Sequence, residues 1–152
     1  MMSNTLLLSA QLAVLALGKL VVYSPKELVD LFATDSGVIN ANYANFGHIP
    51  YGQSLIGSIS YDPANSKGCN IVEISTIESQ GQPTETVDIK KTKIVLVDRG
   101  QCSFVTKVRN AERQGASLVV VVDNRTEDIT NVVMGDDGTG TGIRVPSMLI
   151  GS

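Results

Sequence analysis

The stretch KIVLVDRGQCSFVTKVRNAERQGASLVVVVDN, residues 93–124, decides the fold. It opens with the continuous apolar run 94–97 and passes through a polar turn at 98–101. After a segment of helical spacing it ends in a second apolar run, 118–122, which is rich in Val and does not alternate. A run of that kind is typical of a strand buried on both faces and parallel to its neighbour. The stretch therefore predicts a βαβ unit with a right-handed crossover.

The helix between the two strands has its own signals. Ser103 suits an N-cap, and Gly115 follows the last polar turn as a stop. Phe104, Val108 and Ala111 fall on one face at i, i+4 and i+7. We expect that face to pack on the sheet.

The composition limits the number of domains and the kinds of partner. A chain of 152 residues with 43% hydrophobic and 18% charged residues fits one globular domain. The formal net charge is -3 and Lys and Arg form no long block, which argues against nucleic acid or an anionic membrane as partner. With no Trp and 5% aromatic residues, there is little material for base stacking.

The N-terminus is typical of a secreted protein. Residues 6–17 form an apolar stretch that is too short to span a bilayer but suits the core of a signal peptide. Ala16 and Gly18 both offer cleavage sites, and we expect a signal peptide at 1–18 and a single domain at 19–152. The alternative is a buried N-terminal helix. No other segment of the sequence is suited to span a membrane.

The two cysteines fit an oxidising compartment. A bridge between Cys69 and Cys102 would stabilise the domain by about 3 kcal/mol in the chain-entropy model. A disulfide is the favoured interpretation. The alternatives are a free buried thiol and a catalytic thiolate with His48, the only His, as its partner.

Gly, Pro and polar residues mark the boundaries of the segments on either side of the βαβ unit. A β-type run at 19–23 precedes a helix that begins at Ser24 and Pro25, and an alternating strand is expected at 55–61. We expect irregular backbone at 38–45 and a polar surface segment at 78–92, while the pattern at 71–77 does not decide between strand and loop. Towards the C-terminus we expect a flexible loop at 135–142 and a closing strand at 143–150. Pro146 in that strand should lie at a sheet edge or at the strand start.

Catalytic and metal-binding motifs are missing from the sequence. There is no G-x-S-x-G elbow or H-E-x-x-H, and one His with two Cys cannot complete a four-ligand zinc site. A Ser-His-Asp triad could be drawn through His48, but nothing brings its partners together. Asp136 and Asp137 could contribute to a calcium site, although the EF-hand spacing is absent and a solvated loop is favoured. We expect no enzyme, metal or cofactor.

Two polar residues near the central unit suggest other roles. Asn124 opens an Asn-Arg-Thr glycosylation acceptor. Arg99 lies at the carboxyl end of the first strand, beside the helix start, where it could hold a ligand carboxylate. The alternative, which the sequence favours, is an Arg paired with Asp98 or Glu112.

Four segments carry a family resemblance: I-V-L-V-D-R-G-Q-C-S-F, K-V-R-N-A-E-R-Q-G-A, L-V-V-V-V-D-N and V-P-S-M-L-I. Together they resemble the protease-associated (PA) domain. Residues 45–47, 51–52, 55–57 and 61–63, followed by Cys69, are similar to the N-terminal PA domain of plant-type vacuolar sorting receptors. The resemblance runs from about Lys19 to Ile150.

The resemblance implies a non-catalytic α/β (α+β) domain, in which a β-barrel or sandwich flanked by helices surrounds the βαβ unit. PA domains serve as lids or protein-binding modules, and in sorting receptors they help to bind sorting peptides on soluble cargo. The peptide-binding residues implied here are Asp98, Arg99, Gly100 and Gln101 in a first loop and, by position, Gly135, Asp136 and Asp137 in a second.

The resemblance also implies a compartment and a partner. We expect a protein or peptide ligand, such as a soluble lumenal hydrolase, in the secretory, vacuolar or endosomal lumen or outside the cell. A regulatory or substrate-gating appendage of a protease is the alternative. Gln101 stands where the receptors usually carry an acidic residue, which would alter cargo preference. The family continues beyond the position of Ser152 into a closing helix, so we expect a C-terminally truncated domain.

Overall fold

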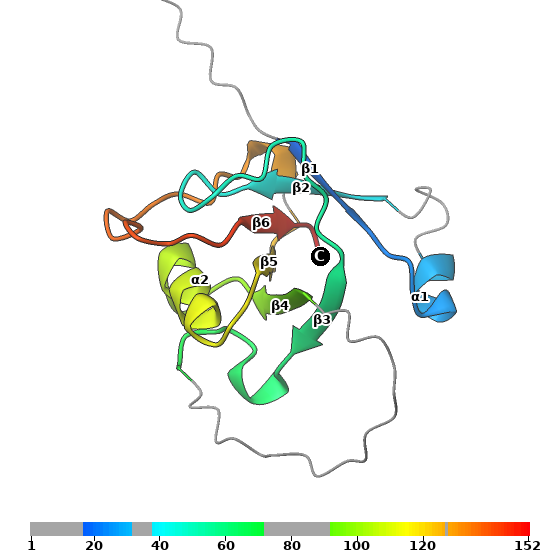
Figure 1. Ribbon diagram of the computed structural model, residues 1–152, viewed down its shortest axis with the longest axis horizontal. Helices are drawn as coiled ribbons and strands as arrows, with labels where there is room; N and C mark the ends of the chain where they lie inside the picture. The colour runs from blue at the N-terminus through cyan, green and yellow to red at the C-terminus, as the bar shows by residue number, and fades with distance from the viewer. Residues whose placement is uncertain (1–16, 32–37, 72–91, 127) are drawn as a thin grey trace, which may run out of the picture.

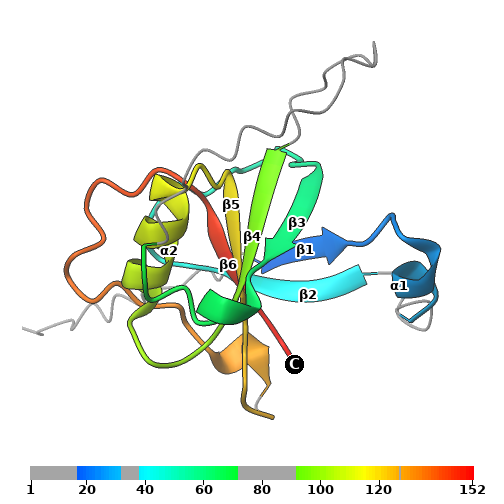
Figure 2. The ribbon, with the colours of Figure 1, turned by 90° about the horizontal axis from the view of Figure 1, so that it is seen from below.

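The chain folds around one curled mixed sheet. The computed structural model describes residues 17–31, 38–71, 92–126 and 128–152. Within these residues a six-stranded sheet forms a half-barrel, with α2 packed on one of its faces and α1 at one end (Figures 1 and 2). This architecture confirms the predicted α/β fold of the PA type.

The strands are β1 (Leu17–Val21), β2 (Val38–Tyr43), β3 (Gly57–Tyr61), β4 (Thr92–Asp98), β5 (Leu118–Val122) and β6 (Ser147–Ile150). The helices are α1 (Lys26–Leu31) and α2 (Phe104–Arg113), with short 3-10 turns at Pro63–Asn65 and Ile129–Asn131. The strand order is β1-β2-β6-β5-β4-β3. The pairs β1/β2 and β2/β6 are antiparallel, and the other neighbours are parallel.

The predicted βαβ unit is β4, α2 and β5. The two strands are parallel, with Ile94 opposite Leu118 and Asp98 opposite Val122. Ser103 caps α2, because its hydroxyl accepts a hydrogen bond from the backbone N–H of Thr106 at 3.1 Å. The helix ends at Arg113, as the glycine stop predicted.

The core lies on both faces of β5. Val119 and Val121 pack beneath α2, and Leu118 and Val120 join a second cluster on the opposite face. Burying each of these side chains stabilises the fold by roughly 1.5–3 kcal/mol. On α2 the fully buried stripe contains Val105, which the sequence analysis missed. Phe104 is only partly buried, at the margin of the cluster.

The prediction of irregular backbone at 38–45 was wrong, because most of that segment is β2. Asn is typical of turns, but the buried side chain of Asn42 donates hydrogen bonds to the carbonyl groups of Ile129 and Val132. Because the side-chain amide of Asn42 has these hydrogen-bond partners, its burial inside the sheet leaves its donors satisfied. The strand is also paired on both sides.

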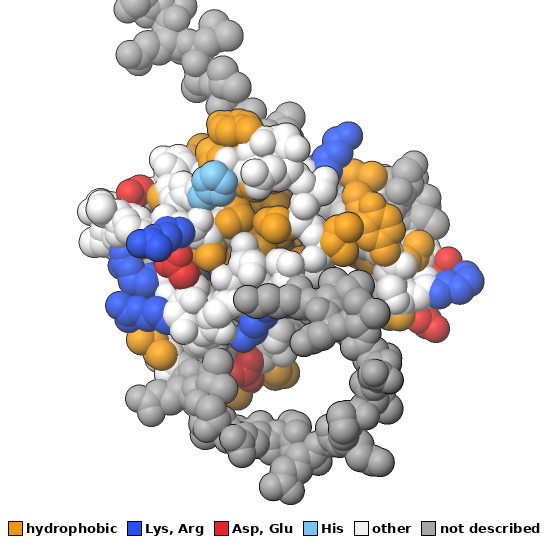
Figure 3. Space-filling view, in the orientation of Figure 1, with side chains coloured by type: hydrophobic (Ala, Val, Ile, Leu, Met, Phe, Trp, Pro, Cys, Tyr) orange, Lys and Arg blue, Asp and Glu red, His pale blue; other side chains and the backbone are white. Residues whose placement is uncertain are grey.

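The strands at two other predicted sites are shorter than expected. β3 starts at Gly57 rather than residue 55, and its apolar side chains are exposed, with Ile59 at 50% and Tyr61 at 45%. β6 starts directly after Pro146, which confirms the expected position of the proline. Figure 3 shows apolar side chains near the centre of one face of the molecule and to the right of it. The undecided segment 71–77, apart from Ile71, and residues 78–91 lie outside the described residues.

Candidate ligand-binding surface

The predicted first loop, residues 98–102, lies where β4 ends and α2 begins, and is called the Arg99 loop below. Its first residue, Asp98, is held by Lys67 at 3.3 Å and by the hydroxyl of Tyr61 at 3.4 Å. The backbone N–H of Arg99 donates to Val122 at 2.9 Å, which prolongs the pairing of β4 with β5. The loop therefore leaves the sheet from a fixed position.

Arg99 pairs with Asp123, not with the expected Asp98 or Glu112. Its guanidinium donates to the Asp123 carboxylate at 2.8 Å, and the side chains are 18% and 0% exposed. The same guanidinium lies over the ring of Phe104, 5.7 Å from its centroid. Asp123 also accepts the backbone N–H of Arg125 at 3.1 Å. Arg99 thus links the ends of β4 and β5 to the start of α2.

The tip of the Arg99 loop has unusual backbone geometry. Gly100 has φ 112°, and Gln101 has φ 66°, the left-handed region in which a side chain costs about 1–2 kcal/mol. The N–H of Cys102 donates back to the carbonyl oxygen of Gly100 at 2.9 Å. The side chain of Gln101 is exposed. Such strain at an exposed residue persists only where the surroundings hold it.

The predicted disulfide is confirmed. Cys69 and Cys102 are bonded, with their Cα atoms 5.8 Å apart, so the alternatives of a free or a catalytic thiol were wrong. The bond fastens the Arg99 loop to the segment that follows β3. Gly68 in that segment packs against Val97, and its carbonyl oxygen accepts the side-chain amide of Asn110 at 3.1 Å.

The predicted second loop, residues 135–142, is called the Asp136 loop below. It contains no helix or strand, as expected, and its carboxylates accept hydrogen bonds from its own backbone. Asp136 accepts backbone N–H groups of Gly138 at 2.9 Å and Gly140 at 2.8 Å, and Asp137 accepts that of Thr139 at 3.0 Å. These are intraloop contacts. Within the described ranges no group of three or more His, Cys, Asp or Glu is placed to hold a metal ion.

The Asp136 loop contacts α2, the helix that directly follows the Arg99 loop. The Ser103 hydroxyl at the start of α2, followed by Thr139, lowers the pKa of Asp137. Further along α2, the guanidinium of Arg109 donates to the carbonyl oxygen of Thr139. The Asp136 loop thus lies against α2, although Arg109 and Thr139 are 30 residues apart in the sequence.

The sequence profile of the PA domain matches residues 55–152. The chain belongs to the PA domain family. This membership confirms the resemblance drawn from the sequence and accounts for the half-barrel with α2 on one face.

Plant sorting receptors are among the relatives of this PA domain. Vacuolar-sorting receptor 2 of Arabidopsis thaliana is 34% identical over 123 residues, 75% of this chain and 18% of the receptor. Vacuolar-sorting receptor 1 of Pisum sativum is 36% identical over 113 residues, 70% of this chain and 17% of the receptor. Signal peptide peptidase-like 2 of Arabidopsis thaliana is 35% identical over 57 residues, 38% of this chain and 10% of that protein. The chain therefore spans under a fifth of each receptor.

Lys107 is a residue of the PA domain that the sequence analysis did not single out. It is fully buried, and its ammonium donates to the carbonyl oxygens of Lys67 at 2.5 Å and Gly100 at 2.6 Å. Burial, followed by the charge of Lys67, lowers the pKa of Lys107 to about 8. The signal was its position three residues after Phe104 and four before Ala111, on the helical face expected to be apolar.

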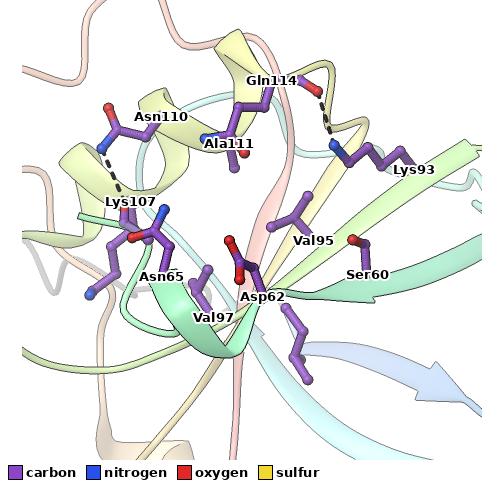
Figure 4. Close-up of a pocket in the computed structure, with 12 residues that line it drawn as sticks. Ser60, Asp62, Asn65, Lys93, Val95, Val97, Lys107, Asn110, Ala111 and Gln114 are labelled. Atoms are coloured by element: carbon purple, nitrogen blue, oxygen red, sulfur yellow. Dashed lines mark hydrogen bonds between the residues drawn. The ribbon is translucent and has the colours of Figure 1, made fainter. Parts of the chain in front are cut away.

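A cavity of about 50 Å³ lies between α2, β4 and the end of β3 (Figure 4). On its α2 side, Lys93 reaches the carbonyl oxygen of Gln114 at 3.1 Å, and Ser60 and Asp62 come from the opposite wall. The space suits a few water molecules and is far smaller than a typical ligand pocket of about 300–1,000 Å³. This cavity is therefore no candidate for a peptide-binding site.

The glycosylation candidate, Asn124, borders the Arg99 loop. It is exposed, and its side-chain amide lies 3.4 Å from the carbonyl oxygen of Arg99. None of the helices in the described ranges combines the length and apolar character that a membrane span requires.

Proposed function

We propose that this PA domain is a non-catalytic binding module that holds an extended peptide or protein segment against the Arg99 loop and residues 135–137. The observation that carries the proposal is the exposed Gln101, held at φ 66° in a loop with buried anchors. Those anchors are the pair of Arg99 with Asp123 and the disulfide of Cys102 with Cys69. A loop ordered before binding loses less conformational entropy when a ligand arrives.

Within this proposal the residues take different roles. Gly100 and Gln101 form the contact surface of the first loop, and Gly135, Asp136 and Asp137 form the facing wall. Arg99 acts chiefly through Asp123, because this ion pair fixes the loop from which Gln101 projects. Asp98 joins the loop to Lys67 in the same way. Acceptor groups on Asp137 suit a ligand that offers N–H or ammonium donors.

Similarity to vacuolar-sorting receptors supports a sorting-peptide ligand on a lumenal protein. The disulfide fits an oxidising compartment of the secretory pathway or the vacuole. The sequence predicts a signal peptide at 1–18, and we further propose that its cleavage falls after Ala16, the other site that the sequence offers. Cleavage after Ala16 leaves β1 whole, whereas cleavage after Gly18 would remove two of its residues, Leu17 and Gly18, which pair with Asn42 and Ala41.

A second candidate function is a regulatory appendage of a protease. The similarity to Signal peptide peptidase-like 2 favours it, although that match covers 38% of this chain, against 75% for Vacuolar-sorting receptor 2. An appendage would bind the substrates of a linked peptidase. A sorting module would instead bind one short motif shared by unrelated cargo proteins.

Selection of ligands from a random heptapeptide library on the oxidised chain tests the proposal. The selected peptides should share one motif and compete for one site. Gln101→Glu should change their affinity about tenfold or more, because it adds a charge at the centre of the contact surface. Gln53→Glu is the matched control, since Gln53 is also exposed and belongs to another loop. Equal effects of the two substitutions would place the peptides elsewhere and overturn the proposal.

A further inference from the structure

Lys107 is the only buried Lys or Arg among the residues that the structure describes. A buried ammonium costs several kcal/mol unless hydrogen bonds replace its water. None of the ion pairs found in the described ranges includes Lys107. Instead, two backbone carbonyl groups take up its donors, and the Sγ atom of Cys69 lies 3.7 Å away. The residue therefore joins α2 to the Arg99 loop and to the segment before Cys69.

The charges around this ammonium are few. Lys67 comes from the segment after β3 and disfavours the charged form, and Asp98 comes from the end of β4 and favours it. The disulfide on the remaining side does not titrate. The carbonyl groups of Lys67 and Gly100, together with Asp98, thus compensate for the buried charge.

The contact with Gly100 orients a peptide group. The carbonyl oxygen of Gly100 accepts hydrogen bonds from Lys107 at 2.6 Å and from the Cys102 N–H at 2.9 Å, so it faces the interior. The peptide bond from Gly100 to Gln101 is trans. In a planar trans peptide the C=O and N–H groups point in opposite directions. The N–H of Gln101 consequently points away from Lys107, and no acceptor for it occurs in the described part of the chain.

We propose that Lys107 is a positioning residue of the peptide-binding surface: its hold on Gly100 turns the Gln101 N–H outward as a donor to a ligand's backbone carbonyl or terminal carboxylate. This role rests on the proposed function. It explains why a charged residue occupies a helical face that otherwise packs on the sheet. It also explains how a non-glycine residue is kept at φ 66°.

The test compares Lys107→Met with Lys93→Met. Both replace a lysine that donates to a backbone carbonyl, but Lys93 bonds to Gln114, away from the Arg99 loop. In carbon-detected NMR spectra that correlate each carbonyl carbon with the following nitrogen, Lys107→Met should displace the signal joining Gly100 to Gln101. Lys93→Met should leave that signal in place. Affinity for the library-selected heptapeptide should fall about tenfold in Lys107→Met and less than about twofold in Lys93→Met.

A pH titration of the unmodified chain serves if Lys107→Met does not fold. The Gly100 carbonyl signal should then titrate with the same midpoint as the Lys107 side chain, near the pKa of about 8. An unmoved Gly100 signal, or undiminished peptide affinity in a folded Lys107→Met, would overturn the role. A chain that selects no heptapeptide would overturn the proposed function as well, whereas loss of this role alone leaves peptide selection intact.

Discussion

Arg99 and Asp123 form an ion pair at 2.8 Å that joins the carboxyl ends of the parallel strands β4 and β5. The Asp123 side chain has no exposed surface, so the pair is largely screened from water. The register explains the contact, because Asp98 stands opposite Val122 and the residues that follow them are neighbours. Arg99, which the sequence suggested as a partner for a ligand carboxylate, thereby pairs with the carboxylate of Asp123 within the domain.

Removing the Arg99 side chain should therefore destabilise the fold as well as alter the proposed binding surface. We expect Arg99→Ala to lower the free energy of unfolding by about 3 kcal/mol, because it leaves the buried carboxylate of Asp123 unpaired. Asp98→Asn is the control, since its pair with Lys67 is 28–30% exposed and should be worth about 1 kcal/mol or less. Urea denaturation measures both. Similar losses in the two variants would show that the Arg99 pair is no more important than a surface pair.

Lys107 should give stability a particular dependence on pH. Its pKa is about 8 in the folded state and 10.5 in the unfolded chain, so the unfolded state binds more protons between these values. Stability should rise with pH across this window, by up to about 1.4 kcal/mol per pH unit from this group. Denaturation from pH 7 to pH 10 should show this rise in the unmodified chain relative to Lys107→Met. Parallel curves for the two proteins would contradict the lowered pKa.

A glycan at Asn124 would compete with the ligand. The Asn124 amide lies 3.4 Å from the carbonyl oxygen of Arg99, beside the exposed tip of the loop. We expect chain produced without the glycan, by Thr126→Ala, to bind the selected heptapeptide several-fold more tightly than the glycosylated chain. Thr130→Ala keeps the acceptor and should bind like the unmodified protein. If intact mass shows a glycan and its removal changes nothing, the ligand does not approach from this side.

The mature chain should begin at Leu17. Leu17 and Gly18 pair with Asn42 and Ala41, and a side chain at position 18 would meet the ring of Tyr43 at 2.9 Å. Cleavage that preserves β1 must therefore fall before Leu17. N-terminal sequencing of the secreted product decides the matter. A mature start at Lys19 would mean that β1 loses its first two residues, and retention of residues 1–16 would mean that they are not a signal peptide.

The sequence predicted the parts of the fold that hydrophobic spacing controls. β4, α2 and β5 follow from uninterrupted apolar runs and a capped helix, because such patterns have few other ways to bury their side chains. β2 did not follow, since Asn42 resembles a turn residue until the carbonyl groups of Ile129 and Val132 are seen beside it. Its hydrogen-bond partners lie 87 and 90 residues away in the sequence.

The candidate surface was only partly predictable, because here too some contacts join residues that are far apart in the sequence. The disulfide and the position of the Arg99 loop could be read from the cysteine positions, the family pattern and the end of β4. The partner of Arg99 could not, because the choice of Asp123 depends on strand register. Lys107 was overlooked because lysine is rarely buried, and the carbonyl groups that permit it come from two distant segments.

The central claim is that a peptide binds to the Arg99 loop and residues 135–137. Backbone amide NMR signals of the oxidised chain, recorded while the selected heptapeptide is added, test it most directly. The largest changes should fall on residues 99–103 and 135–137 and saturate together. Changes concentrated on the exposed β3, or spread evenly over the domain, would contradict the claim.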